Sequence, residues 1–349
     1  IASCLVGSEM CIRDRNSDTP FATLTPECLL SAIESLGFRC DGRLLQLNSF
    51  ENRVYQVWLE DGNQRIAKFY RPGNWSDDAI LEDHAFTLEL TEQEIPVVPP
   101  IIFNGKTLHH WEGHRFALFE KQGGRTPELE RIETLEWVGR FLGRIHGIGA
   151  CCEYKVRPSL DIQSFGIQSR DFIVAGDWLP EDVRSAWISV ADQALDCVSH
   201  AYQRAGDVQT LRLHGDCHPG NLLWTDEGPH FVDFDDSRTG PAIQDIWMLL
   251  SGNELDARNQ LAAVLRGYEM FREFDDRELH LIEALRTLRL IHYSAWIARR
   301  WNDPAFIIAF PWFGTNRYWQ DRILELREQV ALMQELSLIH ISEPTRQEA

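Results

Sequence analysis

The chain becomes mainly helical in pattern after residues 120–127, and this change constrains the fold more than any other feature. Before it, short apolar runs at 44–50, 53–59 and 65–70 are separated by turn residues, and Asp61-Gly62-Asn63 is a strong hairpin signal. After it, apolar residues recur at helical spacing over most of the chain. The sequence therefore predicts an α+β protein with a small antiparallel-sheet lobe followed by a mainly helical lobe.

Two helices and two further strands complete the predicted first lobe. Thr25 and Ser76 each precede a helical pattern, and both residue types are suited to cap a helix. Residues 101–103 and 114–119 have strand-like composition, and we expect Asn104-Gly105 to form the turn between them. The first lobe would then contain five strands.

The polar, glycine-bearing stretch Glu120–Pro127 is the predicted linker between the lobes. It divides the chain into an N-terminal lobe at 16–120 and a C-terminal lobe at 121–336. The helical patterns of the second lobe lie at 133–146, 180–205, 241–250, 254–273 and 276–301.

Both ends of the chain carry sequence that looks foreign to this fold. The opening IASCLVGSEMCIRDR and the closing SLIHISEPTRQEA resemble translated adapter sequence that recurs on unrelated predicted proteins. We therefore expect 1–15 and 337–349 to be non-native tails. The alternative is a genuine disordered tail at each end.

Composition limits the classes of partner. A formal net charge of −19 repels polyanions and argues against a nucleic-acid partner. No apolar run reaches the roughly 18 to 20 residues that cross a bilayer, so we expect no membrane partner. The eight cysteines form no C-x-x-C pair, which favours reduced thiols in the cytoplasm.

The segment that bears chemistry is Leu211–Asn221, a loop by composition, since glycine, proline and asparagine deny it a regular element. Asp216 and Asn221 are separated by four residues, and Asp233 follows twelve residues later, before Phe234. This is the H-x-D-x-x-x-x-N plus D-F arrangement of a phosphoryl-transfer site. There, an aspartate orients or deprotonates the attacking hydroxyl, while an asparagine oxygen and a second carboxylate hold Mg²⁺ against nucleotide phosphates. We expect Asp216 and Asp233 to be catalytic, and Asn221 and Asp233 to bind the metal.

Two histidines flank Asp216. We expect His214 to brace the loop by hydrogen bonding, since such a position transfers protons less often than it supports the loop. His218 has two open interpretations, a contact with the phosphoryl group or substrate and a simple loop-packing role.

Longer motifs carry a resemblance to a known family. HGDCHPGN, FVDFDD and GPAIQDIWML resemble the aminoglycoside-phosphotransferase and choline-kinase superfamily, which shares its two-lobed architecture with protein kinases. Within it, LNSFENRVYQV and KFYRPGNW resemble the bacterial stress-response Ser/Thr protein kinases, over nearly everything between the two tails. The resemblance implies a protein-kinase-like fold, ATP as co-substrate with Mg²⁺, protein substrates with Ser/Thr acceptors, and a cytoplasmic monomer active in the stress response.

The same resemblance assigns further residues. Lys68 matches the V-A-I-K lysine that pairs with nucleotide phosphates. Its carboxylate partner should come from the next helix, where both Glu82 and Asp83 are available, and we take Glu82. Asp245 resembles the buried aspartate that ties down the catalytic loop, and the adenine-binding hinge should lie near 119–122.

The phosphate-binding loop departs from the protein-kinase pattern. The segment Asn48–Asn52 lacks G-x-G-x-x-G, although backbone N–H groups and the Ser49 hydroxyl could still cradle phosphate. The resemblance assigns Ser49 to the ATP site. An ordinary turn is the alternative.

The acceptor is the least constrained part of the prediction, because the same catalytic loop serves sugar, choline, homoserine and protein hydroxyls across the superfamily. The segment 286–301 is aromatic and locally basic, which argues against a cationic aminoglycoside, although core packing alone could explain its apolar residues. We expect a Ser/Thr protein kinase. The alternatives are a small-molecule kinase of the homoserine, choline or aminoglycoside type, and a catalytically dead nucleotide-sensing module.

Overall fold

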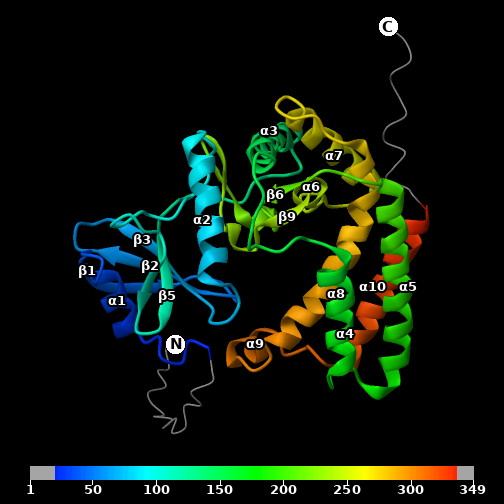
Figure 1. The fold of residues 1–349 in the computed structure, drawn as a ribbon, viewed down its shortest axis with the longest axis horizontal. Coiled ribbons are helices and arrows are strands. Elements are labelled where there is room, and N and C mark those ends of the chain that lie inside the picture. The colour runs from blue at the N-terminus through cyan, green and yellow to red at the C-terminus, as the bar shows by residue number, and fades with distance from the viewer. Residues whose placement is uncertain (1–19, 336–349) are drawn as a thin grey trace, which may run out of the picture.

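A five-stranded antiparallel sheet forms the N-terminal lobe of the computed structural model, which describes residues 20–335 (Figure 1). Its strand order is β1-β2-β3-β5-β4. The strands are β1 (Cys40–Gln46), β2 (Arg53–Leu59), β3 (Gln64–Tyr70), β4 (His109–Trp111) and β5 (His114–Glu120). The predicted hairpin at Asp61-Gly62-Asn63 joins β2 to β3, with Gly62 at a φ of 85°. The predicted tails at 1–15 and 337–349 lie outside the described residues.

Two capped helices accompany this sheet, as predicted. The Thr25 side chain accepts a hydrogen bond from the Cys28 N–H at the start of α1 (Pro26–Glu34), and Ser76 accepts from Ala79 at the start of α2 (Asp77–Glu92). Helix α1 buries its apolar side against the sheet, where Phe69 and Phe116 stack with ring centroids 5.2 Å apart. The local capping signals therefore set the helix starts, and the apolar core fixes α1 on the sheet.

The position of the fourth strand corrects the prediction. Asn104 and Gly105 do form a tight turn, with reciprocal hydrogen bonds between Phe103 and Lys106 at 2.8 and 3.0 Å. The fourth strand is nevertheless β4, and its hairpin with β5 turns at Glu112 and Gly113. Residues 101–103 follow two prolines, which have no N–H to donate to a ladder, so this segment makes only isolated bridges.

The C-terminal lobe is mainly helical, as expected, but several predicted helices are shorter. The helix predicted at 241–250 is only α6 (Ile243–Trp247), and the helix predicted at 254–273 is α7 (Glu254–Tyr268), which ends five residues earlier. The helix predicted at 276–301 is divided into a 3₁₀ turn and α8 (Ile282–Arg299). The other helices are α3 (Ile132–Gly149), α4 (Gln168–Ala175), α5 (Glu181–Ala205), α9 (Pro304–Ala309) and α10 (Asn316–Glu335).

Two short strand pairs in this lobe escaped sequence analysis. Strand β6 (Thr210–Leu213) pairs with β9 (Arg238–Pro241), and β7 (Leu222–Thr225) pairs with β8 (Gly228–Phe231). Each strand has only four residues, too few to display an alternating pattern. The β6–β9 pair lies beside α6, near the middle of the molecule (Figure 1).

Close packing of α3 against α7 supports this central region. A Cβ atom on Gly139 of α3 would lie 2.1 Å from the Val264 carbonyl oxygen of α7, so only glycine permits this approach. The same helix pair brings His146 and Tyr268 together, with His146 Nδ1 3.1 Å from the Tyr268 hydroxyl. Within residues 20–335, no helix combines the length and apolar character needed to span a membrane.

Candidate active site

The predicted catalytic loop runs from the end of β6 to the start of β7. The predicted loop at 211–221 is shorter than expected, because Leu211–Leu213 belong to β6 and Pro219–Asn221 form a 3₁₀ turn. Gly215 has a φ of 86°, and a Cβ atom there would lie 2.2 Å from the Asp236 carbonyl oxygen. Only glycine therefore lets this loop pass so close to the segment after Asp233.

Asp245 is fully buried beneath the loop and holds its backbone. Its two carboxylate oxygens accept hydrogen bonds from the His214 and Gly215 N–H groups, each at 2.8 Å. His146 Nε2 lies 3.1 Å from the same carboxylate. These contacts fit the predicted role of Asp245 in tying down the loop.

His214 makes contacts of the bracing kind. Its Nε2 lies 2.9 Å from the Val232 carbonyl oxygen, and its Nδ1 accepts from the Asp216 N–H at 3.3 Å. Its ring packs on Phe234 with a centroid separation of 4.4 Å. Both ring nitrogens are thus engaged by backbone groups, which is what a bracing role requires.

Asp216 lies between an arginine and a histidine side chain at the end of this loop. Arg289 Nη1 is 2.8 Å from one carboxylate oxygen, and His218 Nε2 is 3.4 Å from the other. Asn221 Nδ2 donates to the Asp216 carbonyl at 2.9 Å, so the remaining polar atom of Asn221 is the oxygen that a metal would use. Burial alone would raise the pKa of Asp216, but His218 and Arg289 outweigh it and hold the pKa well below its usual range.

Asp233 and Lys68 meet across the two lobes. Asp233 has a left-handed backbone, with φ 65° and ψ 64°, and its side chain remains 52% exposed. Lys68 Nζ lies 2.7 Å from Asp233 and 3.3 Å from Asp235. Burial would lower the pKa of Lys68, but the two carboxylates outweigh it and keep the lysine charged. The structure thus brings the lysine of β3 to the predicted metal-binding carboxylate.

The predicted pairing of Glu82 with Lys68 is not found. Glu82 points away from Lys68 and accepts hydrogen bonds from the backbone N–H groups of residues 155–157, at 2.7 to 3.1 Å. Asp83, the alternative partner, is buried and lines the same cavity as Lys68. Successive helix residues point about 100° apart, so the turn of α2 that directs Asp83 inward directs Glu82 outward.

A cavity of about 390 Å³ lies between the lobes and contains most of the predicted nucleotide-site residues. Ser49 and Lys68 line it from the N-terminal lobe, and Asn221 and Asp233 line it from the C-terminal lobe. Phe119, Glu120 and Gln122 form another wall, where the hinge was predicted. We call this the nucleotide cavity. A larger cavity of about 650 Å³, beside the start of η4 (Asp276–Leu281), contains none of the predicted site residues.

A further cavity, of about 370 Å³, is lined by Asp216, which does not line the nucleotide cavity. Arg289, His292, Tyr293 and Trp296 of α8 line it, whereas Leu288 and Ile291 of the same helix are core residues. Helix α8 thus both lines a cavity with basic and aromatic residues and packs apolar residues into the core, the two interpretations that the sequence left open for 286–301. We call this the acceptor cavity.

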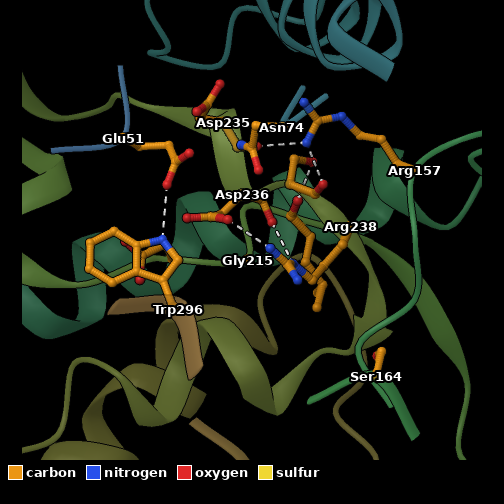
Figure 2. Close-up of polar contacts among 12 residues, drawn as sticks. Glu51, Asn74, Arg157, Ser164, Gly215, Asp235, Asp236, Arg238 and Trp296 are labelled. Atoms are coloured by element: carbon orange, nitrogen blue, oxygen red, sulfur yellow. Dashed lines mark hydrogen bonds and ion pairs between the residues drawn. The ribbon is translucent and has the colours of Figure 1, made fainter. Parts of the chain in front are cut away.

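The loop after Ser49 closes one side of the acceptor cavity. Glu51 accepts a hydrogen bond from Trp296 Nε1 at 2.9 Å and pairs with Arg300 at 2.6 Å, and Figure 2 shows Glu51 reaching down onto the Trp296 ring. Asp303, at the start of α9, pairs with Arg71 at 2.6 Å. The N-terminal lobe and α8–α9 are therefore joined by buried ion pairs directly beside the site.

Residues 43–282 match the family described as the phosphotransferase enzyme family. The chain belongs to this family. Its membership confirms the α+β two-lobed fold and the resemblance found in the motifs.

Curated proteins with kinase names are similar over nearly the whole chain. Stress response kinase A of Escherichia coli K12 is 43% identical over 320 residues, which cover 92% of this chain and 97% of that protein. Serine/threonine protein kinase RdoA of Salmonella typhimurium is 44% identical over 315 residues, covering 90% and 95%.

Solved structures of more distant phosphotransferases share the fold. Amicoumacin kinase hAmiN, in complex with AMP-PNP, Ca²⁺ and Ami, has a TM-score of 0.67 at 19% identity and covers 91% of this chain and 93% of its own. A microcompartment-associated aminopropanol kinase has the same TM-score and identity, covering 89% and 99%.

Two supporting residues of this phosphotransferase site were missed. Arg157 is buried and donates to the carbonyls of Asp235 and Ser237, at 2.8 and 2.6 Å, as Figure 2 shows in part. Asn52 donates to the Asp235 carboxylate at 2.7 Å and so holds the second partner of Lys68. Their contacts span 78 to 183 residues along the chain, and no local spacing could have indicated them.

Proposed function

We propose that this phosphotransferase is an ATP- and Mg²⁺-dependent Ser/Thr protein kinase of the bacterial stress response. It would transfer the γ-phosphoryl group of ATP to protein hydroxyls. The observation that carries the proposal is that the loop between β6 and β7 lines both cavities: Asp216 lines the acceptor cavity, and Asn221, whose Nδ2 lies 3.4 Å from the Asp216 carboxylate, lines the nucleotide cavity together with Asp233. The names of the curated relatives support the protein acceptor and the stress role. By the same similarity, we propose a cytoplasmic monomer.

The residues at the nucleotide cavity fit Mg²⁺ bound together with nucleotide phosphates. Asn221 and Asp233 offer an amide oxygen and a carboxylate, the hard oxygen ligands that Mg²⁺ prefers. Residues 20–335 contain no group of three or more His, Cys, Asp or Glu side chains placed to hold a metal. This suits an ion that keeps waters and takes its other ligands from substrate phosphates. When bound, Mg²⁺ would offset negative charge on the phosphates.

The other residues of the two cavities would bind the phosphates and position the acceptor hydroxyl. Lys68 would contact the phosphates from β3, and Ser49 with its neighbouring backbone N–H groups would cover them. Asp216 would accept a hydrogen bond from the acceptor hydroxyl, orient it and take its proton as the phosphoryl group is transferred. Asp245 and His214 would keep this carboxylate in place through the loop backbone.

A small-molecule kinase is the second candidate function. The acceptor cavity holds about 370 Å³, a volume ordinary for a small-molecule site, and structural neighbours include kinases of small alcohols. A catalytically dead nucleotide-sensing module is less well supported, since Asp216, Asn221 and Asp233 are all retained.

Labelled ATP separates these functions. The purified chain would be incubated with Mg²⁺ and γ-labelled ATP, with a casein-like protein in one arm and a panel of small alcohols in the other. We expect label in the protein acceptor. Label only in free alcohols would overturn the Ser/Thr assignment in favour of the second candidate, and no transfer in either arm would favour the dead module.

A further inference from the structure

The acceptor cavity holds carboxylates and arginines in near balance. Arg238 and Arg289 line it together with Glu51, Asp216 and Asp236, and Arg300, just past the end of α8, reaches Glu51. Burial, with the nearby arginines as the further cause, lowers the pKa of His292 to about 3, so this ring is neutral near pH 7. What the cavity can bind therefore depends on which of its charged groups is still accessible.

The acidic residues of this cavity are already paired. Glu51 binds Arg300 and the Trp296 indole, and Asp236 pairs with Arg238 at 2.7 Å, as Figure 2 shows. The third, Asp216, pairs with Arg289. A cationic substrate would therefore have to break an internal ion pair before it found a carboxylate.

The aromatic wall of the cavity is no better suited to a cation. Tyr293 and Trp296 stack with centroids 5.8 Å apart. The guanidinium of Arg300 already lies 5.0 Å from the Trp296 ring centre, where a cationic ligand would bind. The chain's own arginine thus occupies the cation-binding face of the indole.

Arg289 differs from the other arginines of the cavity. Its side chain is 44% exposed, whereas that of Arg238 is 8% exposed and tied to both the carbonyl and the carboxylate of Asp236. Arg289 binds the carboxylate oxygen of Asp216 that is not shared with His218 or Asn221. An acceptor hydroxyl needs this carboxylate too, so the Arg289 guanidinium must be shared or moved when an acceptor is bound.

We propose that the acceptor hydroxyl is flanked by an anionic group, a carboxylate or a phosphate, and that Arg289 binds this group beside Asp216. This inference rests on the proposed function. For a protein acceptor, the anionic group is the side chain of an acidic or phosphorylated residue next to the acceptor Ser or Thr. A planar guanidinium can bind such a group through two parallel hydrogen bonds while the hydroxyl takes its place at Asp216. Arg289 is then a specificity-determining residue.

Matched peptides test the proposal. One series places Asp, phosphoserine, Asn or Lys beside a single acceptor serine, so the first two arms separate a carboxylate from a phosphate source. In the wild-type protein, we expect kcat/KM for the better of the Asp and phosphoserine peptides to exceed that for the Asn peptide by about tenfold or more. The Lys peptide should have the lowest kcat/KM. In Arg289→Gln this preference should fall to about one, chiefly through a higher KM for the acidic peptide.

Arg299→Gln is the matched control, because Arg299 lies on the same helix but packs over Phe172, outside the cavity. It should keep the wild-type preference. Thermal melting of both variants within a few degrees of wild type would establish that Arg289→Gln acts on recognition and not on folding. Equal kcat/KM for the Asp, phosphoserine and Asn peptides in the wild-type protein, or a preference that survives Arg289→Gln, would overturn the proposal.

Small alcohols distinguish failure of this inference from failure of the Ser/Thr assignment. If no peptide is phosphorylated but free alcohols are, the protein acceptor is wrong, and 3-hydroxypropionate and 3-aminopropanol then provide the same comparison of charge. Preference for the hydroxy acid, lost in Arg289→Gln, would support the anion-binding role. Preference for the amino alcohol would refute it.

Discussion

The nucleotide cavity and the acceptor cavity have similar volumes, about 390 and 370 Å³, and the loop between β6 and β7 lines both, but they are built differently. On the nucleotide side each chemical group lies in a short motif: Asn221 and Asp233 are twelve residues apart, and Lys68 of β3 reaches Asp233 from 165 residues away. The acceptor side brings Glu51 from the first lobe onto Trp296 of α8, 245 residues away. Reaction chemistry is therefore encoded in short motifs, whereas the acceptor site depends on how distant elements pack.

The electrostatic character of the two cavities also differs. In the nucleotide cavity, one buried lysine meets several carboxylates, an arrangement that suits a metal ion and phosphates together. In the acceptor cavity, arginines neutralise the carboxylates directly. Substitutions on the two sides should therefore have separable effects, which the following predictions examine.

The largest effects should come from the catalytic carboxylates. We expect Asp216→Ala and Asp233→Ala each to lower turnover by about a thousandfold or more, since each removes a group needed for transfer. Only Asp233→Ala should also weaken Mg-nucleotide binding, measured by calorimetric titration. Unchanged turnover in either variant would contradict the site assignment.

Lys68→Met should have the next largest effect. It removes the cation that faces Asp233 and the phosphate site, and we expect turnover to fall by about a hundredfold, with a higher KM for ATP and little change in KM for the acceptor. Lys106→Met, at an exposed turn of the same lobe, is the control. If Lys68→Met raised only the KM for the acceptor, the claim that the two cavities bind different substrates would be wrong.

Glu82→Gln should affect stability more than nucleotide binding. Glu82 accepts three backbone hydrogen bonds from residues 155–157, and these bonds outweigh burial and lower the pKa of the carboxyl. Losing the charge at this partly exposed site should cost about 1 kcal/mol of unfolding free energy and leave the KM for ATP within about twofold of wild type. Glu92→Gln, exposed on the same helix, is the control. A large rise in the KM for ATP would instead show that Glu82 contributes to nucleotide binding.

The last effect appears only as a pH dependence of stability and concerns a buried histidine in each cavity. Burial lowers the pKa of both His84 and His292 from 6.5 to about 3. The unfolded chain then binds more protons below pH 6.5, so this part of the stability is present above pH 6.5 and is lost as the pH falls. We expect about 1–2 kcal/mol per histidine between about pH 7 and pH 5.

Chemical unfolding across that pH range measures the effect. His84→Gln and His292→Gln should each flatten the pH dependence by a similar amount, because both histidines owe their low pKa mainly to burial. A variant whose stability follows pH in parallel with wild type would show that its histidine is not the group responsible.

The sequence predicted those features that are locally encoded. Thr25 and Ser76 marked two helix starts, and the H-x-D-x-x-x-x-N spacing indicated residues that the fold does bring together. The four-residue strands β6 to β9 were missed because they are too short for a period to emerge. Glu82 was preferred to Asp83 on reach, whereas the rotation of α2 decides which of them faces Lys68. Arg157 and Asn52 could not be found, since only tertiary packing brings them to Asp235.

The central claim is that one phosphoryl-transfer centre uses separate cavities for the nucleotide and the acceptor. Its most direct test is transfer of γ-label from ATP to a casein-like acceptor, measured side by side in wild type, Asp216→Ala and Arg289→Gln. The wild-type protein should label the acceptor, and Asp216→Ala should not. Arg289→Gln should label it more slowly, with an unchanged KM for ATP and a higher KM for the acceptor. Labelling by Asp216→Ala at the wild-type rate would contradict the central claim.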